Sequence, residues 1–198
     1  MAVDFGLLEK ELQAMAMADG ATEFKRIHTH DISTAHWVRQ KCQFGCPNYG
    51  LRLSCPPYTP GSDETRKVLD GYANAYILGY DGYLYLESNN LSQKDDWISG
   101  FGAHVRKSML DLERHAFLEG YHKALTYGFG GCRRCETCAI AQGNTTCKFP
   151  AEFRTSMEAA GIDVLGTLKT AGLELSLRGE KEVTRRGQVV FHVLLLLG

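Results

Sequence analysis

The chain has 198 residues, in which 22 Lys and Arg nearly balance 23 Asp and Glu. A chain of this length can bury one ordinary hydrophobic core, so we expect residues 1–198 to form a single domain. The balanced charge removes any bulk electrostatic argument for binding nucleic acid or an anionic membrane, and we expect neither as a partner.

The first ten residues lack the basic start and the apolar stretch of a signal peptide. The longest apolar run, residues 189–197, contains His192 and is far shorter than the roughly 20 residues of a membrane-spanning helix. We therefore expect a soluble cytoplasmic protein.

The first third of the chain is predicted to alternate helices with one strand. Hydrophobic periodicity predicts a helix over residues 4–18, a strand over 22–29 and a short helix that ends beyond Val38. Residues 42–61 are rich in Pro and Gly and are expected to be loop. Ser62 is predicted to cap the next helix.

The middle of the chain carries the clearest helical pattern. Residues 75–80 are a predicted strand, and residues 83–86 its continuation or its hairpin partner across Asp81-Gly82. Apolar residues that recur every three or four positions predict a long helix from about residue 94 to 119. Residues 124–127 are a short predicted strand that leads into a glycine-rich stretch.

The last part is predicted to contain two helices and a hairpin. A helix is expected over residues 150–160 with Gly161 at its end, followed by a helical piece over 162–171. Residues 173–177 and 188–196 are predicted strands. Helices interleave with strands and hairpins are expected, so we favour an α+β fold, a mixed β-sheet packed with helices and carrying two cysteine-rich metal-binding loops. An α/β fold is the alternative.

All seven cysteines fall in two short stretches, which suits metal binding. In a reducing cytosol, clustered thiols bind metal more often than they form disulfides, and an odd number would leave one thiol over. We predict that all seven are metal ligands and hold the cofactor. The first cysteine group is Cys42, Cys46 and Cys55, and the second cysteine group is Cys132, Cys135, Cys138 and Cys147.

The second cysteine group opens with the C-x2-C-x2-C spacing of bacterial ferredoxins, which bind a [4Fe–4S] cluster. Such a cluster needs one thiolate for each iron, from ligands that converge from several directions. The group departs from the ferredoxin pattern because Cys147 follows after eight residues, and Pro150 comes three residues later. This gap is no obstacle if Cys147 ligates the same cluster.

The first cysteine group supplies three thiols and no obvious fourth ligand. A three-cysteine cluster leaves one iron open to water, a substrate or a partner. His28, His30 and His36 are candidates for the fourth position, although imidazole ligands on such clusters are uncommon. A further interpretation is that the two groups meet in space, as one larger cluster or as two adjacent clusters.

Zinc is the competing metal. Structural zinc sites use pairs of C-x2-4-C knuckles, and a triplet at spacing two would leave one thiol unused, so we favour iron–sulfur. Cations near the cysteines lower thiol pKa values and offset the negative charge of a cluster, the alternative being a solvated basic surface. These cations are Arg39, Lys41, Arg52, Arg133, Arg134 and Lys148.

Three further motifs support a family resemblance: Trp37-Val-Arg before Cys42-x3-Cys46, Cys55-Pro-Pro-Tyr58, and Arg154-x-Ser156-Met-Glu-Ala-x-Gly161. With these motifs the chain resembles the predicted metal-binding protein family of unknown function (domain of unknown function 2284), cysteine-rich proteins of anaerobic bacteria and archaea. Arg154-Thr-Ser departs from the family's usual Arg-Pro-Ser. The resemblance implies cysteine-bound metal and an anaerobic source, and it implies no reaction.

These observations predict a cytoplasmic iron–sulfur protein that transfers electrons or assists a redox enzyme, with a redox partner protein. One alternative is an enzyme that binds substrate at the open iron of the first cysteine group. The other is a zinc-stabilised binding module. The sequence names no catalytic residue and leaves open whether the protein is an enzyme.

Overall fold

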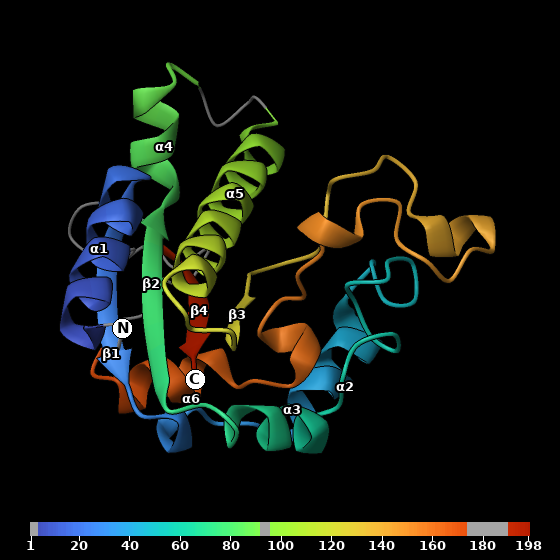
Figure 1. Ribbon diagram of the computed structural model, residues 1–198. Coiled ribbons are helices and arrows are strands. Elements are labelled where there is room, and N and C mark those ends of the chain that lie inside the picture. Colours follow the sequence, from blue (N-terminus) through green and yellow to red (C-terminus); the bar gives the residue numbers. More distant parts are fainter. Residues whose placement is uncertain (1–3, 92–95, 174–189) are drawn as a thin grey trace.

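The computed structural model describes residues 4–91, 96–173 and 190–198 (Figure 1). Within these ranges the chain forms six α-helices and four β-strands, joined by loops and short 3-10 turns. In chain order the elements are α1 (Phe5–Ala18), β1 (Ala21–Ile27), α2 (His36–Gly45), α3 (Ser62–Leu69), β2 (Asn74–Asp81), α4 (Gly82–Ser88), α5 (Trp97–Leu118), β3 (Ala124–Tyr127), α6 (Val164–Thr170) and β4 (Val190–Leu197).

The four strands form one sheet in the order β1-β2-β4-β3, and every neighbouring pair is antiparallel. β4 comes last in the sequence but pairs with β2 on one side and with β3 on the other. Tyr76 of β2, for example, lies opposite Leu195 of β4, which lies opposite Thr126 of β3. The sheet and its helices confirm the predicted α+β class, but the prediction of a mixed sheet is wrong, because all three strand pairs among the described residues are antiparallel.

Helices cover both faces of the sheet, and this explains the apolar sequences of β2 and β4. Tyr76, Leu78 and Val193 pack with α1 and α5 in one core, whereas Ile77 and Leu194 pack with α3 and α6 in the other. Because alternate side chains of a strand point to opposite faces, a strand buried on both sides needs apolar residues throughout. Residues 193–197 are all fully buried.

The predicted strand over residues 83–86 is wrong, because these residues form α4. The Asp81 side chain caps this helix: its Oδ1 accepts hydrogen bonds from the N–H of Tyr83 at 2.7 Å and of Leu84 at 3.3 Å. The apolar alternation of Tyr-Leu-Tyr-Leu suggested a strand, but a side-chain cap at the end of β2 starts a helix. Asp81-Gly82 is therefore a strand-to-helix junction and not a hairpin turn.

The predicted helix over residues 150–160 is also wrong, because the chain forms two separate 3-10 turns there, Pro150–Glu152 and Glu158–Ala160. Between them, the N–H of Met157 donates to the Gly128 carbonyl at 2.9 Å, and the N–H of Gly128 donates to the Thr155 carbonyl at 2.8 Å. Main-chain groups that bond across to the segment after β3 cannot also form a continuous helix.

Most other predicted boundaries agree with the structure within a few residues. Ser62 is the first residue of α3, whose N-cap is Gly61 and not Ser62 as predicted. Gly161 ends the second 3-10 turn in a left-handed conformation, with φ of 81°. The predicted strand over residues 173–177 lies almost wholly outside the described residues, as do the first positions of the strand predicted from residue 188.

The two stretches that carry the cysteines project together to one side of the sheet (Figure 1). One follows α2 and leads to α3, and the other follows β3. None of the helices in the described ranges combines the length and the apolar character needed to cross a membrane.

Candidate metal centre

The first cysteine group lies at the end of α2 and in the loop that follows it. Cys42 is in the last turn of the helix, and Cys46 caps it, with its N–H donating to the Cys42 carbonyl at 3.2 Å. Cys55 lies in the loop before α3 and is only 7% exposed, whereas Cys46 is exposed. The predicted loop therefore begins near Cys46, one helical turn later than expected.

The three thiols of the first cysteine group are close enough to influence one another. Burial raises the pKa of the Cys42 thiol, and the charges of Cys46 and Glu158 raise it further. Burial also raises the pKa of Cys55, with further increases from Cys46 and Cys42. The three thiols of this group therefore lie in the same part of the structure.

Neighbouring cations act on these two thiols in the expected direction but do not control the outcome. Arg39 lowers the pKa of Cys42, and Arg52 lowers that of Cys55, as does a hydrogen bond from Ser54. Burial nevertheless outweighs these effects, because a thiolate removed from water loses its hydration. The predicted direction of the cations' effect is therefore confirmed at both thiols, although burial raises the net pKa of each.

All four cysteines of the second cysteine group line one small cavity. They come from the irregular stretch after β3, whose only regular element among the described residues before Pro150 is the 3-10 turn Ala139–Gln142. Part of the opposite wall comes from the loop of the first cysteine group. The other lining residues are Arg52, Leu53, Ser54, Arg134, Ala139, Lys148, Phe149, Glu152 and Phe153.

Main-chain N–H groups point at two sulfurs of this cavity. The N–H of Leu53 donates to Sγ of Cys138 at 3.5 Å, and the N–H of Phe149 donates to Sγ of Cys147 at 3.4 Å. Hydrogen bonds to sulfur favour the thiolate and are a main way in which proteins tune metal-bound cysteine. The surroundings of the second cysteine group therefore suit charged sulfur ligands.

Residues 52–54 connect the two cysteine groups. The N–H of Cys132 donates to Oγ of Ser54 at 3.2 Å, and the Arg52 guanidinium donates to the Cys135 carbonyl at 3.4 Å. On the other side, a Cβ atom at Gly131 would lie only 3.8 Å from Sγ of Cys55. The two groups are therefore neighbours, with Cys55 against the start of the second one.

The segment from Arg154 to Asp163 fixes both cysteine-bearing stretches to the sheet and its helices. The Arg154 guanidinium forms a two-pronged ion pair with Glu113 of α5, whose Oε1 also accepts the N–H of Thr126 in β3 at 2.6 Å. Further along this segment, the carbonyls of Ala159 and Ala160 accept hydrogen bonds from α3 and the loop before it. The hydroxyl of Thr59, before α3, donates to Ala159, and that of Thr65, within α3, donates to Ala160, both at 2.6 Å.

Several cations near the cysteines are held by other partners. Arg134 pairs with Glu152 at 2.8 Å and lies over the Phe149 ring, 4.2 Å from its centre. The hydrogen bond to Glu152 and the charge of this carboxylate raise the pKa of Arg134. Arg134 therefore places a positive charge at the wall of the cavity that the second cysteine group lines. Lys41, by contrast, lies over the Trp37 ring at 4.7 Å.

The histidines proposed as a fourth ligand of the first cysteine group have other partners. Nε2 of His36 is 3.2 Å from Asp63, and its Nδ1 is 3.1 Å from Oγ of Ser62. His28 stacks on His30 at 5.1 Å between ring centres, where the chain leaves β1. The structure therefore gives no support to these three residues as ligands.

Glu158 is a site residue that the sequence did not single out. Its Oε2 atom is buried without a hydrogen-bond partner among the described residues, and burial raises the pKa of its carboxyl group. It lies with Cys42 and Cys46 on a cleft of about 650 Å³ between α2, α6 and β4, which His192 also lines. An acid in a helix-like stretch gives no sequence signal of burial.

The donor set of the second cysteine group fits an iron–sulfur cluster, although its cavity is small. The enclosed volume of about 30 Å³ exceeds the roughly 10–15 Å³ that one water needs. A cube of iron and sulfide is larger, so binding one requires this irregular stretch to widen. In the part of the chain that the structure describes, no three His, Cys, Asp or Glu side chains are gathered tightly enough to hold a single metal ion as they stand.

The fold and this site define a cysteine-rich α+β protein with two adjacent groups of thiols. The chain belongs to the family described as Predicted metal-binding protein (DUF2284), which matches residues 25–197. That match includes both cysteine groups and supports a metal cofactor in general. No curated protein and no solved structure showed significant similarity to the chain.

Proposed function

We propose that this protein is a cytoplasmic iron–sulfur protein that transfers electrons or assists a redox enzyme, with a redox partner protein. The second cysteine group holds a [4Fe–4S] cluster through its four thiolates, and the first cysteine group holds a second cluster beside it. One observation carries the proposal: all four cysteines of the second group line one cavity, with main-chain N–H groups directed at the sulfurs of Cys138 and Cys147.

Iron–sulfur is favoured over zinc by the number and the placement of the thiols. Four cysteines around one cavity complete the ligands of a cube, and the first cysteine group lies next to them, with Cys55 against Gly131. A zinc-stabilised binding module would use at most one of these groups as a closed four-ligand site. A cluster would supply reversible one-electron chemistry, and this chain's residues would supply its thiolates and the hydrogen bonds that set its potential.

Anaerobic purification followed by iron, zinc and acid-labile sulfide analysis tests this function. We expect iron and sulfide in equal amounts, with a brown colour that dithionite bleaches. The Cys135→Ser variant should lose the iron and the sulfide that the second cysteine group binds. Stoichiometric zinc without sulfide in the anaerobic protein would instead establish the zinc-stabilised module.

A second candidate function is an enzyme that binds its substrate at the first cysteine group. The observation that favours it is the open cleft of about 650 Å³, which Cys42 and Cys46 line together with the buried carboxyl group of Glu158. Three thiols would leave one position of a cluster without a cysteine ligand, and this cleft is the open space beside two of those thiols.

Electron paramagnetic resonance of the reduced protein distinguishes this enzyme from an electron carrier. Addition of small thiols, cyanide or small carboxylic acids should change the spectrum of the wild-type protein and leave that of Cys46→Ala unchanged. A spectrum that responds to none of these ligands would favour electron transfer alone.

A further inference from the structure

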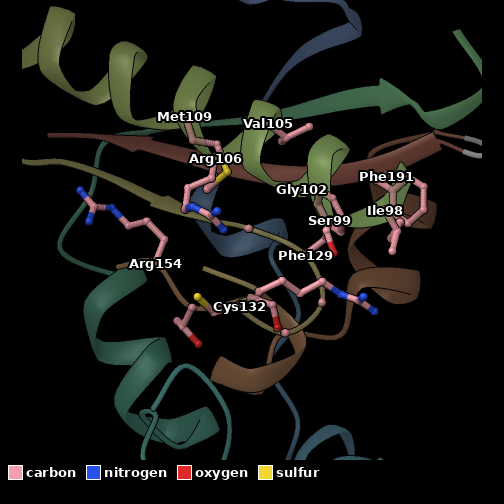
Figure 2. Close-up of a pocket in the computed structure, with 16 residues that line it drawn as sticks. Ile98, Ser99, Gly102, Val105, Arg106, Met109, Phe129, Cys132, Arg154 and Phe191 are labelled. Carbon is pink, nitrogen blue, oxygen red and sulfur yellow. The ribbon is translucent and has the colours of Figure 1, made fainter. Parts of the chain in front are cut away.

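A second enclosed space lies on the other side of Cys132, between α5 and the glycine-rich stretch after β3 (Figure 2). Its volume is about 180 Å³, and Cys132 is the one residue of the second cysteine group among those that line it. Cys132 therefore separates this cavity from the candidate metal centre. Nothing in the proposed function uses this space.

The cavity carries positive charge that its own walls do not neutralise. Arg106, Arg133 and Arg154 line it, and none of the acidic residues in the described ranges does. Arg154 already forms an ion pair with Glu113. Arg133 is exposed to solvent and lies 3.9 Å from Asp96. Arg106 forms no ion pair with any residue that the structure describes. Figure 2 shows it extending from α5 into the space between the helix and the glycine-rich stretch.

The glycine-rich stretch adds main-chain donors to the same space. Gly130 is in a left-handed conformation with φ of 60°, and Gly128, Gly130 and Gly131 line the cavity with backbone atoms because they have no side chain. The N–H groups of Phe129, Gly130 and Gly131 find no acceptor within the described parts of the chain. Successive N–H groups around a left-handed residue commonly form an anion-binding concavity.

The other walls combine apolar side chains with the hydroxyl-bearing residues Ser99, Thr155 and Ser156, so the cavity offers contacts to the body of an organic anion as well as to its charge. The apolar side chains that line it are Ile98, Val105, Met109, Phe129 and Phe191. The volume is also informative, since an apolar cavity of about 150 Å³ holds one benzene molecule. At about 180 Å³, this space has room for a ring of that size and one carboxylate.

We propose that this cavity binds a small organic monocarboxylate with an apolar body about the size of a benzene ring, and that the Arg106 guanidinium is its main cationic contact. Its carboxylate would accept hydrogen bonds from Arg106 and from the N–H groups of the glycine-rich stretch, and its body would pack against Met109 and Phe129. The proposal depends on the geometry of α5 and this stretch and not on the nature of the metal.

Calorimetric titration of the anaerobically purified protein with sodium benzoate tests the proposal. Acetate, benzamide and inorganic phosphate serve as comparisons. We expect benzoate to bind at least about tenfold more tightly than benzamide, because a charge-assisted hydrogen bond is worth about 1.5–3 kcal/mol. Phosphate binding more tightly than benzoate would assign the cavity to an inorganic anion and overturn the organic one. Failure of both acetate and benzoate to bind would overturn the proposal altogether.

Three variants locate the binding site. Arg106→Gln should weaken benzoate binding about tenfold or more, whereas Arg114→Gln, an exposed cation on the same helix, should bind like wild type. Gly102→Leu fills the cavity from a position where an added Cβ meets no atom within 4 Å, and it should abolish binding without unfolding the protein. Equal affinity in all three variants would place any bound benzoate elsewhere.

Metal analysis of the same samples keeps this proposal distinct from the iron–sulfur function. Benzoate binding that depends on Arg106 in a protein without iron would uphold the anion site and reject the cluster. An iron–sulfur protein whose benzoate affinity does not respond to Arg106→Gln would do the reverse.

Discussion

The two cysteine groups lie side by side, yet they differ in access. The second cysteine group surrounds a small enclosed cavity, and N–H groups are directed at two of its sulfurs. The first cysteine group pairs a buried Cys55 with an exposed Cys46 on the edge of a large open cleft. An enclosed set of four thiols suits a stable electron-holding centre, and an open set of three suits ligand exchange. If the proposed function holds, ligand exchange is expected at the first cysteine group.

Removal of one thiol from each group gives the largest expected effect and tests this contrast. Cys138→Ser removes a ligand of the enclosed cavity and should cost the whole cluster there, about half of the total iron. Cys46→Ser removes an exposed ligand and should leave the iron of the second group in place. Iron and sulfide analysis of anaerobically purified variants measures both. Loss of all iron in each variant would show one shared cluster instead of two neighbouring ones.

The attachment of the second group to the sheet should be the next most sensitive point. Glu113→Gln leaves the Arg154 guanidinium without its carboxylate partner in a largely buried position, and we expect a loss of about 3 kcal/mol in the free energy of unfolding. Asp111→Asn, which breaks an exposed pair with Lys107 on the same helix, is the matched control and should change little. Urea denaturation of both variants compares them, and equal stabilities would contradict the anchoring role of Arg154.

Two glycines with the same backbone conformation allow a finer comparison. Gly161 and Gly143 both have φ of 81°, but an added Cβ would lie 2.9 Å from Cα of Ser62 at Gly161 and would meet nothing within 4 Å at Gly143. Gly143→Ala should cost about 1 kcal/mol for the left-handed conformation alone, and Gly161→Ala about 2–3 kcal/mol because α3 must also shift. Thermal unfolding measures the difference. Equal costs would mean that α3 moves freely.

The smallest expected effect concerns the Cys55 thiol in metal-free protein. Burial raises its pKa and the Ser54 hydrogen bond lowers it, so Ser54→Ala should raise this pKa further. A higher pKa means less thiolate at a given pH, and alkylation by iodoacetamide should therefore reach half of its maximal rate at a higher pH in the variant. A lower maximal rate at an unchanged midpoint would indicate altered access and contradict the hydrogen-bond effect.

The sequence predicted the body of the molecule better than its site. The long helix α5 and the strands β2 and β4 follow from apolar periodicity, because burial of these elements depends on local pattern. The helix α4 was missed, since it depends on the Asp81 side chain capping at a junction. The cysteine spacing identified both groups of thiols, and the neighbouring position of the two groups was raised only as an interpretation.

The residues that complete the site could not be predicted from the sequence, because their roles depend on contacts between distant parts of the chain. Leu53 and Ser54 contribute an N–H group and a hydroxyl to the second group, and that contact depends on a loop crossing from elsewhere in the chain. In the sequence, Glu158 and Arg106 look like charged residues on the exposed face of a helix. Each lines a cavity only because of tertiary packing, Glu158 opposite α2 and Arg106 opposite the glycine-rich stretch.

Mössbauer spectroscopy of the anaerobically isolated protein tests the central claim most directly, because it counts the iron environments. Two adjacent clusters, one with four thiolates and one with three, predict a main signal from thiolate-bound iron and a minor signal from one iron with a different ligand. Cys138→Ser should remove the signal of the fully thiolate-bound cluster and keep the minor one. A single uniform environment, or a protein without iron, would contradict the account.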